Sequence, residues 1–401
     1  MRLRGFSLER PQRVAALLLL VLFGQCLWTI GHQPLDANDL RYARCGCQMG
    51  ENPSFLQSSF TTCGNLNHDG ALAYRLAGLP LAAQHVLLLT IHPFRQSADQ
   101  LSANCDPDRG AWQARHPFSL IPYLLRLPFI LFAVWLGGGL WWVAKRLFGP
   151  EGGALALALY TFCPAIVRYA THPNNEVLAM WGLYGLIYTA IGVGHALQGP
   201  RSMWRPRILL LTVALGLTTS AHLLAGVVGF LVGMAFFFYT ADRRRSYVSP
   251  IMICAAMGAL LIVFAGLGFH ISALRNSFTG GSLQSWFRFF PARRFFTHPA
   301  NAGIVAAAAV ALLVYWRNRP SRYFGNTAPL LMALLLFPLS TTQVFTAPWI
   351  WALPFLFTFI GGVFADALES QQRALFLVLT VGVVVTQAVL CWASMAGALP
   401  G

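Results

Sequence analysis

Acidic side chains, which can accept protons or hold a cation, gather in one part of this sequence. Only 13 of the 401 residues are Asp or Glu, and more than half of them fall between residues 32 and 115. These are Asp36, Asp39, Glu51, Asp69, Asp99, Asp106 and Asp108. Because 56% of the chain is hydrophobic, this stretch is the main place where the sequence can carry out polar chemistry.

Three of the acids stand beside apolar runs. Asp36 and Asp39 follow the first apolar run, and Glu176 directly precedes a later one. A carboxylate just above a membrane can take a proton from a hydroxyl group that reacts there. Each acid also has a structural alternative: Asp36 and Asp39 would solvate a loop or cap the next helix, and Glu176 would complement a helix dipole from its first turn.

Arginines interleaved with aromatic residues fill the segment 272–298. Four fixed positive charges of this kind suit a phosphate group. The arginines are Arg275, Arg288, Arg293 and Arg294. The alternative is an amphipathic helix that lies on anionic lipid headgroups without selecting any ligand.

Apolar runs of membrane-spanning length recur along the chain, which indicates an all-α, polytopic integral membrane protein. We expect about eleven spans, at 14–30, 117–143, 152–170, 177–197, 208–221, 223–240, 248–271, 300–316, 327–345, 348–366 and 374–395. The formal charge of +15 comes mostly from arginines at the ends of these runs. We therefore interpret them as determinants of topology and as lipid anchors rather than as a nucleic-acid surface.

The arginine pattern also predicts orientation. Four arginines precede the first apolar run, so the amino terminus should be cytoplasmic, and an odd number of spans then places the carboxyl terminus outside. A cleaved signal peptide is the rival interpretation, but the run is longer than a typical signal core and no small-residue cleavage site follows it. We expect one transmembrane domain over 1–401, with outer loops at 32–115 and 272–298. The apolar stretch 72–94, interrupted by Pro80, should form interfacial or re-entrant helices in the first loop.

Four of the eight cysteines lie in the first outer loop, namely Cys45, Cys47, Cys63 and Cys105. An even number in an oxidising compartment predicts one or two disulfides, with a connectivity that the sequence leaves open. A zinc site is disfavoured because Cys45 and Cys47 are separated by one residue, whereas such sites use paired C-x-x-C spacing. We expect no bound metal.

Residues 115–188 resemble the second to fourth helices of the GT-C membrane glycosyltransferases. The likeness is to the family-39-like group, which contains protein mannosyltransferases and lipid A aminoarabinose transferases. It is carried by Arg-Leu-Pro at 126–128, Lys-Arg-Leu-Phe-Gly at 145–149, a small-residue helix that ends near a proline, and the outer acidic turn His-Pro-Asn-Asn-Glu at 172–176. Ala-Pro-Trp-Ile-Trp-Ala-Leu-Pro at 347–354 is similar to the start of a late helix in that group.

The resemblance implies roles for the acids. The catalytic acid of the superfamily lies just after the first helix, before a Tyr-Ala, and Asp39 in Asp-Ala-Asn-Asp-Leu-Arg-Tyr-Ala at 36–43 matches that place. Asp39 would be the general base, with Asp36 as its companion and Glu176 as the second acid of the family. Two departures are visible: Asn38-Asp39 stands where the family has paired acids, and Ser-Ala-His at 220–222 stands where it has a lysine.

The family's activity would be transfer of a sugar from a polyprenyl-phosphate donor to an acceptor hydroxyl on a lipid, glycan or protein. The reaction would take place at the outer face of a cytoplasmic (inner) membrane and needs no cofactor, and the residues give no support for a divalent metal. Two other classes stay open: an inactive GT-C-like lipid-binding or assembly protein, and a transporter. A transporter is disfavoured because no acid falls securely in the middle of a span.

Overall fold

The structure is a computed structural model and describes residues 10–51, 70–91, 121–270, 292–338, 348–369 and 373–398. Every regular element within these ranges is helical. In chain order the helices are α1 (Arg10–His32), α2 (Ala37–Glu51), α3 (Ala71–Ile91), α6 (Ile121–Thr161), α7 (Pro164–Ala170), α8 (Asn175–Leu197), η2 (Arg201–Met203), α9 (Trp204–Ala221), α10 (Leu223–Ala241), η3 (Asp242–Tyr247), α11 (Val248–Gly266), α13 (Ala292–Thr297), η5 (Pro299–Asn301), α14 (Ala302–Arg317), η6 (Arg319–Ser321), α15 (Phe324–Leu336), η7 (Pro348–Ala352), α16 (Leu353–Leu368) and α17 (Arg373–Met395). The all-α expectation is therefore confirmed.

Seven stretches of helix in the described ranges are long and apolar enough to cross a membrane. Two of these stretches, Ile121–Thr161 and Leu223–Gly266, are 41 and 44 residues long and each joins two of the predicted spans. The helices α9 and α15 correspond to the remaining two predictions, and α15 is short for a span because it has 13 residues. The structure thus contains a helix for each predicted span, which confirms a polytopic membrane protein.

Breaks in the long helices fall at glycine and proline. Within α6 the backbone turns at Gly149, whose φ of 79° is in the left-handed region that glycine adopts without strain, and Pro150 begins the next helical segment. The predicted span 152–170 is interrupted at Cys163, where α7 starts with Pro164 at its first position. Consequently α7 and the turn after it are separate from the long helix and lie beside the end of α1.

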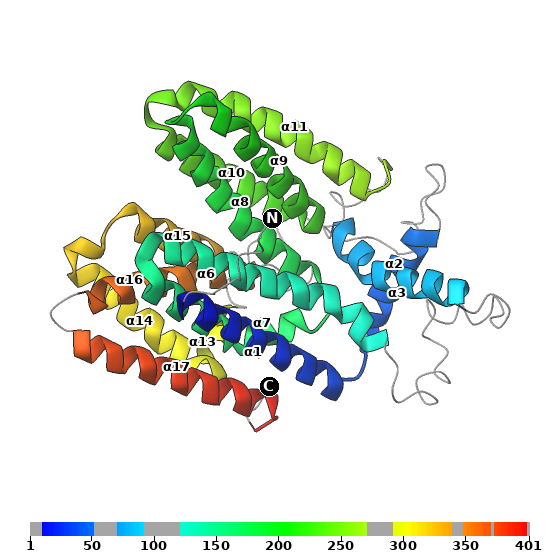
Figure 1. Cartoon of the computed structure of the whole chain (residues 1–401), viewed down its shortest axis with the longest axis horizontal. Coiled ribbons are helices and arrows are strands. Elements are labelled where there is room, and N and C mark those ends of the chain that lie inside the picture. Colours follow the sequence, from blue (N-terminus) through cyan, green and yellow to red (C-terminus); the bar gives the residue numbers. More distant parts are fainter. Residues whose placement is uncertain are drawn as a thin grey trace, which may run out of the picture.

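The helices form two packed groups (Figure 1). One group contains α8 to α11, whose shared core includes Leu186, Leu215, Phe237 and Met252. The other contains α1, α6 and α14 to α17, with α16, which is buried along most of its length, packed on α6. Because α8 contacts both α6 and α16, it connects the two groups.

The first loop contains two helices that pack against each other at one end of the molecule (Figure 1). The helices α2 and α3 cross where Gly46 meets Gly78, and a Cβ built on Gly46 would lie 2.6 Å from the backbone nitrogen of Gly78. Tyr42 of α2 stacks on Tyr74 of α3 with ring centroids 4.4 Å apart. Interfacial or re-entrant helices interrupted at Pro80 were expected over 72–94, whereas the structure has one helix there, α3, which continues through Pro80.

Candidate active site

Asp36 and Asp39 lie at the start of α2, and each side chain binds the backbone of the other residue. The Asp36 carboxylate accepts a hydrogen bond from the Asp39 backbone nitrogen at 2.6 Å, and the Asp39 carboxylate accepts one from the Asp36 nitrogen at 3.2 Å. This reciprocal pattern is a capping box, which satisfies backbone donors that a helix leaves open at its start. The helix-cap alternative is therefore correct for Asp36, but it does not account for the other contacts of Asp39.

Asp39 is completely buried and forms an ion pair with Arg126, which is also completely buried. Arg126 lies in the first turns of α6 and has Leu and Pro around it. Its guanidinium group also donates to the carbonyl oxygens of Gln33 (3.1 Å) and Pro34 (2.9 Å), just past the end of α1. One arginine thus fixes both the carboxylate and the short link between α1 and α2.

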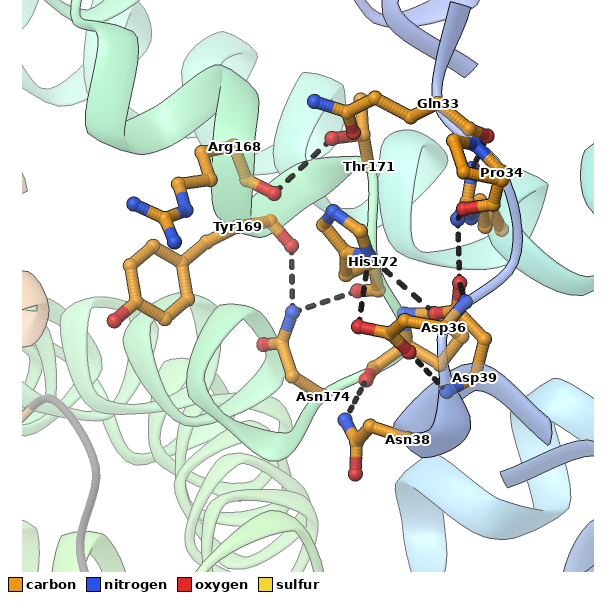
Figure 2. A network of polar contacts seen from close by, with 12 residues as sticks. Gln33, Pro34, Asp36, Asn38, Asp39, Arg168, Tyr169, Thr171, His172 and Asn174 are labelled. Carbon is orange, nitrogen blue, oxygen red and sulfur yellow. Dashed lines mark hydrogen bonds and ion pairs between the residues drawn. The ribbon is translucent and has the colours of Figure 1, made fainter. Parts of the chain in front are cut away.

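His172 approaches the same carboxylates from the turn between α7 and α8 (Figure 2). Its Nδ1 atom lies 3.4 Å from Oδ1 of Asp39 and 4.0 Å from Oδ2 of Asp36. The side chains of His172 and Asp36 are 25% and 55% exposed, whereas that of Asp39 is 0% exposed. The cluster therefore has a buried carboxylate at its base and two groups that solvent can reach.

The charge of Asp39 follows from its neighbours. Burial alone would raise the pKa of Asp39, but the hydrogen bonds with His172 and Arg126 and the positive charge of Arg126 outweigh burial and hold the pKa below its usual value. Asp39 is therefore ionised at neutral pH. An ionised carboxylate with a cation on one side is suited to orienting or stabilising a second group that gains positive charge.

Asp36, Asp39 and His172 are also residue types that can bind a metal ion. One ligand atom from each of Asp36, Asp39 and His172 lies within 4.8 Å of the others. Arg126, however, already places a positive charge on Asp39, and this charge would repel a divalent cation. The donor set therefore fits an ion pair better than a metal centre.

Glu176 lies in the first turn of α8, after the cap residue Asn174. It is 5% exposed, and its Oε2 atom accepts a hydrogen bond from the indole nitrogen of Trp351 at 2.6 Å. The Trp351 ring in turn packs edge-on against His222, with centroids 4.9 Å apart. The structure thus links the third predicted acid to Trp351 of η7.

The predicted phosphate-binding arginines fall partly outside the described residues. Arg275 and Arg288 lie outside them, and Arg293 and Arg294 belong to α13 with side chains that are not described. Phe295 of the same helix is buried and packs against Trp349 of η7, with ring centroids 5.3 Å apart. Trp349 contacts Tyr169 of α7, three residues before His172. The arginine-bearing helix therefore packs through one aromatic residue onto the segment that carries His172.

Of the loop cysteines, Cys45 is buried on α2. The side chains of Cys47, Cys63 and Cys105 lie outside the described residues. Oxidation of the four thiols stays a prediction.

Arg126 and His172 were not selected from the sequence as site residues. Both had a usable signal, because each is a polar residue near the end of a predicted span. In the orientation expected from the sequence, Arg126 also departs from the rule that arginines collect on the inner side. Trp351 had only the weaker signal of a tryptophan between two prolines.

Residues 123–269, which include Arg126, His172 and Glu176, match the family described as dolichyl-phosphate-mannose-protein mannosyltransferase. Comparison with curated protein sequences finds no significant match. The fold is that of the GT-C membrane glycosyltransferases, and the matched segment is similar to the same group, as the sequence resemblance implied.

Two solved structures share this fold along nearly the whole chain. ArnT from Cupriavidus metallidurans in the apo state is 13% identical with a TM-score of 0.59, and the match covers 96% of this chain and 74% of ArnT. The same protein bound to undecaprenyl phosphate is 14% identical with a TM-score of 0.56, over 96% of this chain and 75% of ArnT. The chain is therefore similar in architecture to ArnT, a GT-C aminoarabinose transferase.

Proposed function

We propose that this protein transfers a sugar from a polyprenyl-phosphate donor to an acceptor hydroxyl at the outer face of a cytoplasmic membrane. The observation that carries the proposal is that Arg126 of α6 and His172 of the α7–α8 turn both meet the buried carboxylate of Asp39 at the start of α2. Long-range convergence of ionised groups inside an apolar protein is costly, and such groups are common at catalytic sites. The GT-C fold and the undecaprenyl phosphate bound to ArnT support a lipid-phosphate donor.

The proposed division of labour follows the charges. The cluster around Asp39 accepts the proton that the acceptor hydroxyl loses as its oxygen attacks the sugar. The arginines of the segment 272–298, including Arg293 and Arg294 on α13, bind the phosphate that departs. The donor's polyprenyl chain stays in the bilayer, so the sugar reaches the cluster from the membrane side. Glu176, held by Trp351, is proposed as a second acid that binds the sugar.

The proposed orientation places the cluster outside. The amino terminus would be cytoplasmic and the carboxyl terminus external, so that α2, the α7–α8 turn and α13 face the same outer compartment.

A transfer assay tests the proposal. The purified full-length protein would be reconstituted in liposomes with a polyprenyl-phosphate-linked sugar and a membrane extract from the source cells as the acceptor. We expect time-dependent release of polyprenyl phosphate, measured by mass spectrometry, with the wild type and not with Asp39→Asn. Equal release with both proteins, or no release from any polyprenyl-phosphate sugar tried, would contradict the proposed function.

A further inference from the structure

We infer that Nε2 of His172 is the atom that takes the proton from the acceptor, and that Asp39 acts through His172. This inference rests on the proposed function and divides the roles within its proton-accepting cluster. His172 would be the catalytic base, and Asp39 and Arg126 would be positioning residues.

Access to the two groups favours His172. The Asp39 side chain is 0% exposed, and its carboxylate already receives Arg126, the Asp36 backbone nitrogen and His172. An acceptor hydroxyl would have to displace one of these partners to reach it. His172 is 25% exposed, so the acceptor can reach its imidazole while the cluster stays intact.

The orientation of the ring agrees with its access. Nδ1 is the nitrogen that faces both carboxylates, at 3.4 Å from Asp39 and 4.0 Å from Asp36. Figure 2 shows the other ring nitrogen on the side away from them. A carboxylate that accepts a hydrogen bond from Nδ1–H selects the neutral tautomer in which Nε2 carries a free lone pair. The distance to Asp39 is long for a hydrogen bond, as is common before a substrate binds.

The backbone around His172 is fixed by side chains on either side of it. The Asn174 amide donates to the carbonyl oxygens of Tyr169 and His172, both at 2.6 Å, and its own oxygen caps α8 through the Val177 nitrogen. The Thr171 hydroxyl bonds back to α7. The Asn38 amide reaches the Pro173 carbonyl oxygen at 3.5 Å and so joins the turn to α2. A base held in this way loses little orientational freedom when it acts.

The acceptor oxygen gives its proton to Nε2 and forms a bond to the anomeric carbon of the sugar, while the bond from that carbon to the donor phosphate breaks. The electron pair of the broken bond stays on the phosphate oxygen, and polyprenyl phosphate leaves. The imidazolium that forms is stabilised by Asp39, whose negative charge lies on the Nδ1 side. It then releases its proton to solvent, which reaches His172 directly.

The replacement His172→Asn separates the two roles of the ring. The Asn amide nitrogen can occupy the place of Nδ1 and keep the hydrogen bond to Asp39, but nothing replaces Nε2. We expect kcat for sugar transfer to fall about 10²- to 10⁴-fold, with KM for the donor and the melting temperature unchanged. His32→Asn is the matched control and should keep wild-type activity, because His32 is exposed at the end of α1, where its ring bonds the Trp28 carbonyl oxygen of its own helix.

Added imidazole gives a second readout that a structural role would not produce. In His172→Gly, imidazole in solution should raise kcat in a concentration-dependent way, and it should not raise the rate of Asp39→Asn. The inference is overturned if His172→Asn transfers sugar at close to the wild-type rate while Asp39→Asn is inactive, because Asp39 would then be the base. It is also overturned if the loss lies in KM, or if imidazole restores nothing. Failure of the proposed function is a different result, in which the wild type itself shows no transfer.

Discussion

At the scale of single residues, the pair of Asp39 and Arg126 holds the site together. Both side chains are fully buried, and a buried charge that loses its partner is destabilising by about 3 to 5 kcal/mol. We therefore expect Asp39→Asn to lower the free energy of unfolding by about 3 kcal/mol as well as to stop transfer. The double replacement Asp39→Asn with Arg126→Gln should be more stable than the sum of the single changes predicts, as a double-mutant cycle would measure.

The same residue predicts a dependence of stability on pH. The pKa of Asp39 is lower in the folded protein than in the unfolded chain, so its contribution is fully present above about pH 4, the ordinary carboxylate range. The contribution is lost as the pH falls through the depressed pKa. Thermal unfolding of the wild type and of Asp39→Asn would be measured in detergent from pH 7 to pH 3. The difference between their melting temperatures should become smaller only below about pH 4. A difference in melting temperature that already becomes smaller near pH 6 would contradict the stabilising role of the ion pair.

The proposed role of the α13 arginines predicts how their replacement changes the binding of the donor lipid. Arg293→Gln with Arg294→Gln should weaken binding of undecaprenyl phosphate at least about tenfold, because charge-assisted contacts contribute about 1.5 to 3 kcal/mol each. Arg201→Gln with Arg205→Gln removes the same charge from exposed positions at the start of α9 and serves as the control for general attraction to anionic lipid. If both pairs lower the affinity equally, α13 is only a headgroup anchor.

At the scale of elements, α2 must be held in place for Asp39 to meet His172. The closest constraint is the crossing of α2 and α3 at Gly46 and Gly78, where no Cβ fits without backbone movement. Gly46→Ala should separate the two helices, lower the melting temperature and reduce transfer, even though residue 46 is remote from the acceptor. Gly24→Ala in α1 is the matched control, because a Cβ there meets nothing within 4 Å. Equal behaviour of the two variants would show that the crossing does not position α2.

The elements also show what the sequence could predict. Long apolar runs predicted the spans of α1, α8, α10, α11, α14, α16 and α17 because local hydrophobicity decides them. The break at Cys163-Pro164 was missed, since proline at the first position of a helix continues an apolar run without a change of composition. Asp39 was found from its place after the first span, but its partners are 87 and 133 residues away in the chain. They meet only in the folded protein, where α2 packs on α3 and α3 packs on α6.

At the scale of the whole molecule, aromatic packing through Trp349 connects the segments that carry the two proposed parts of the reaction. The segment that carries His172 packs through Tyr169 and Trp349 against Phe295 of α13. A donor phosphate on α13 and a proton acceptor at His172 would therefore lie on neighbouring segments of one outer surface. An inactive assembly protein with the same fold would need the helices but not the charge of Asp39.

Complementation of a deletion strain separates these two accounts most directly. Cells that lack the gene would receive the wild type, Asp39→Asn, or the charge-balanced double variant Asp39→Asn with Arg126→Gln, at equal expression in the membrane. The glycosylated acceptor lost on deletion would be identified and measured by mass spectrometry of the envelope. We predict that the wild type restores it and that neither variant does, although the double variant is present and folded. Restoration of the acceptor by Asp39→Asn would contradict the enzymatic account and leave the assembly role in its place.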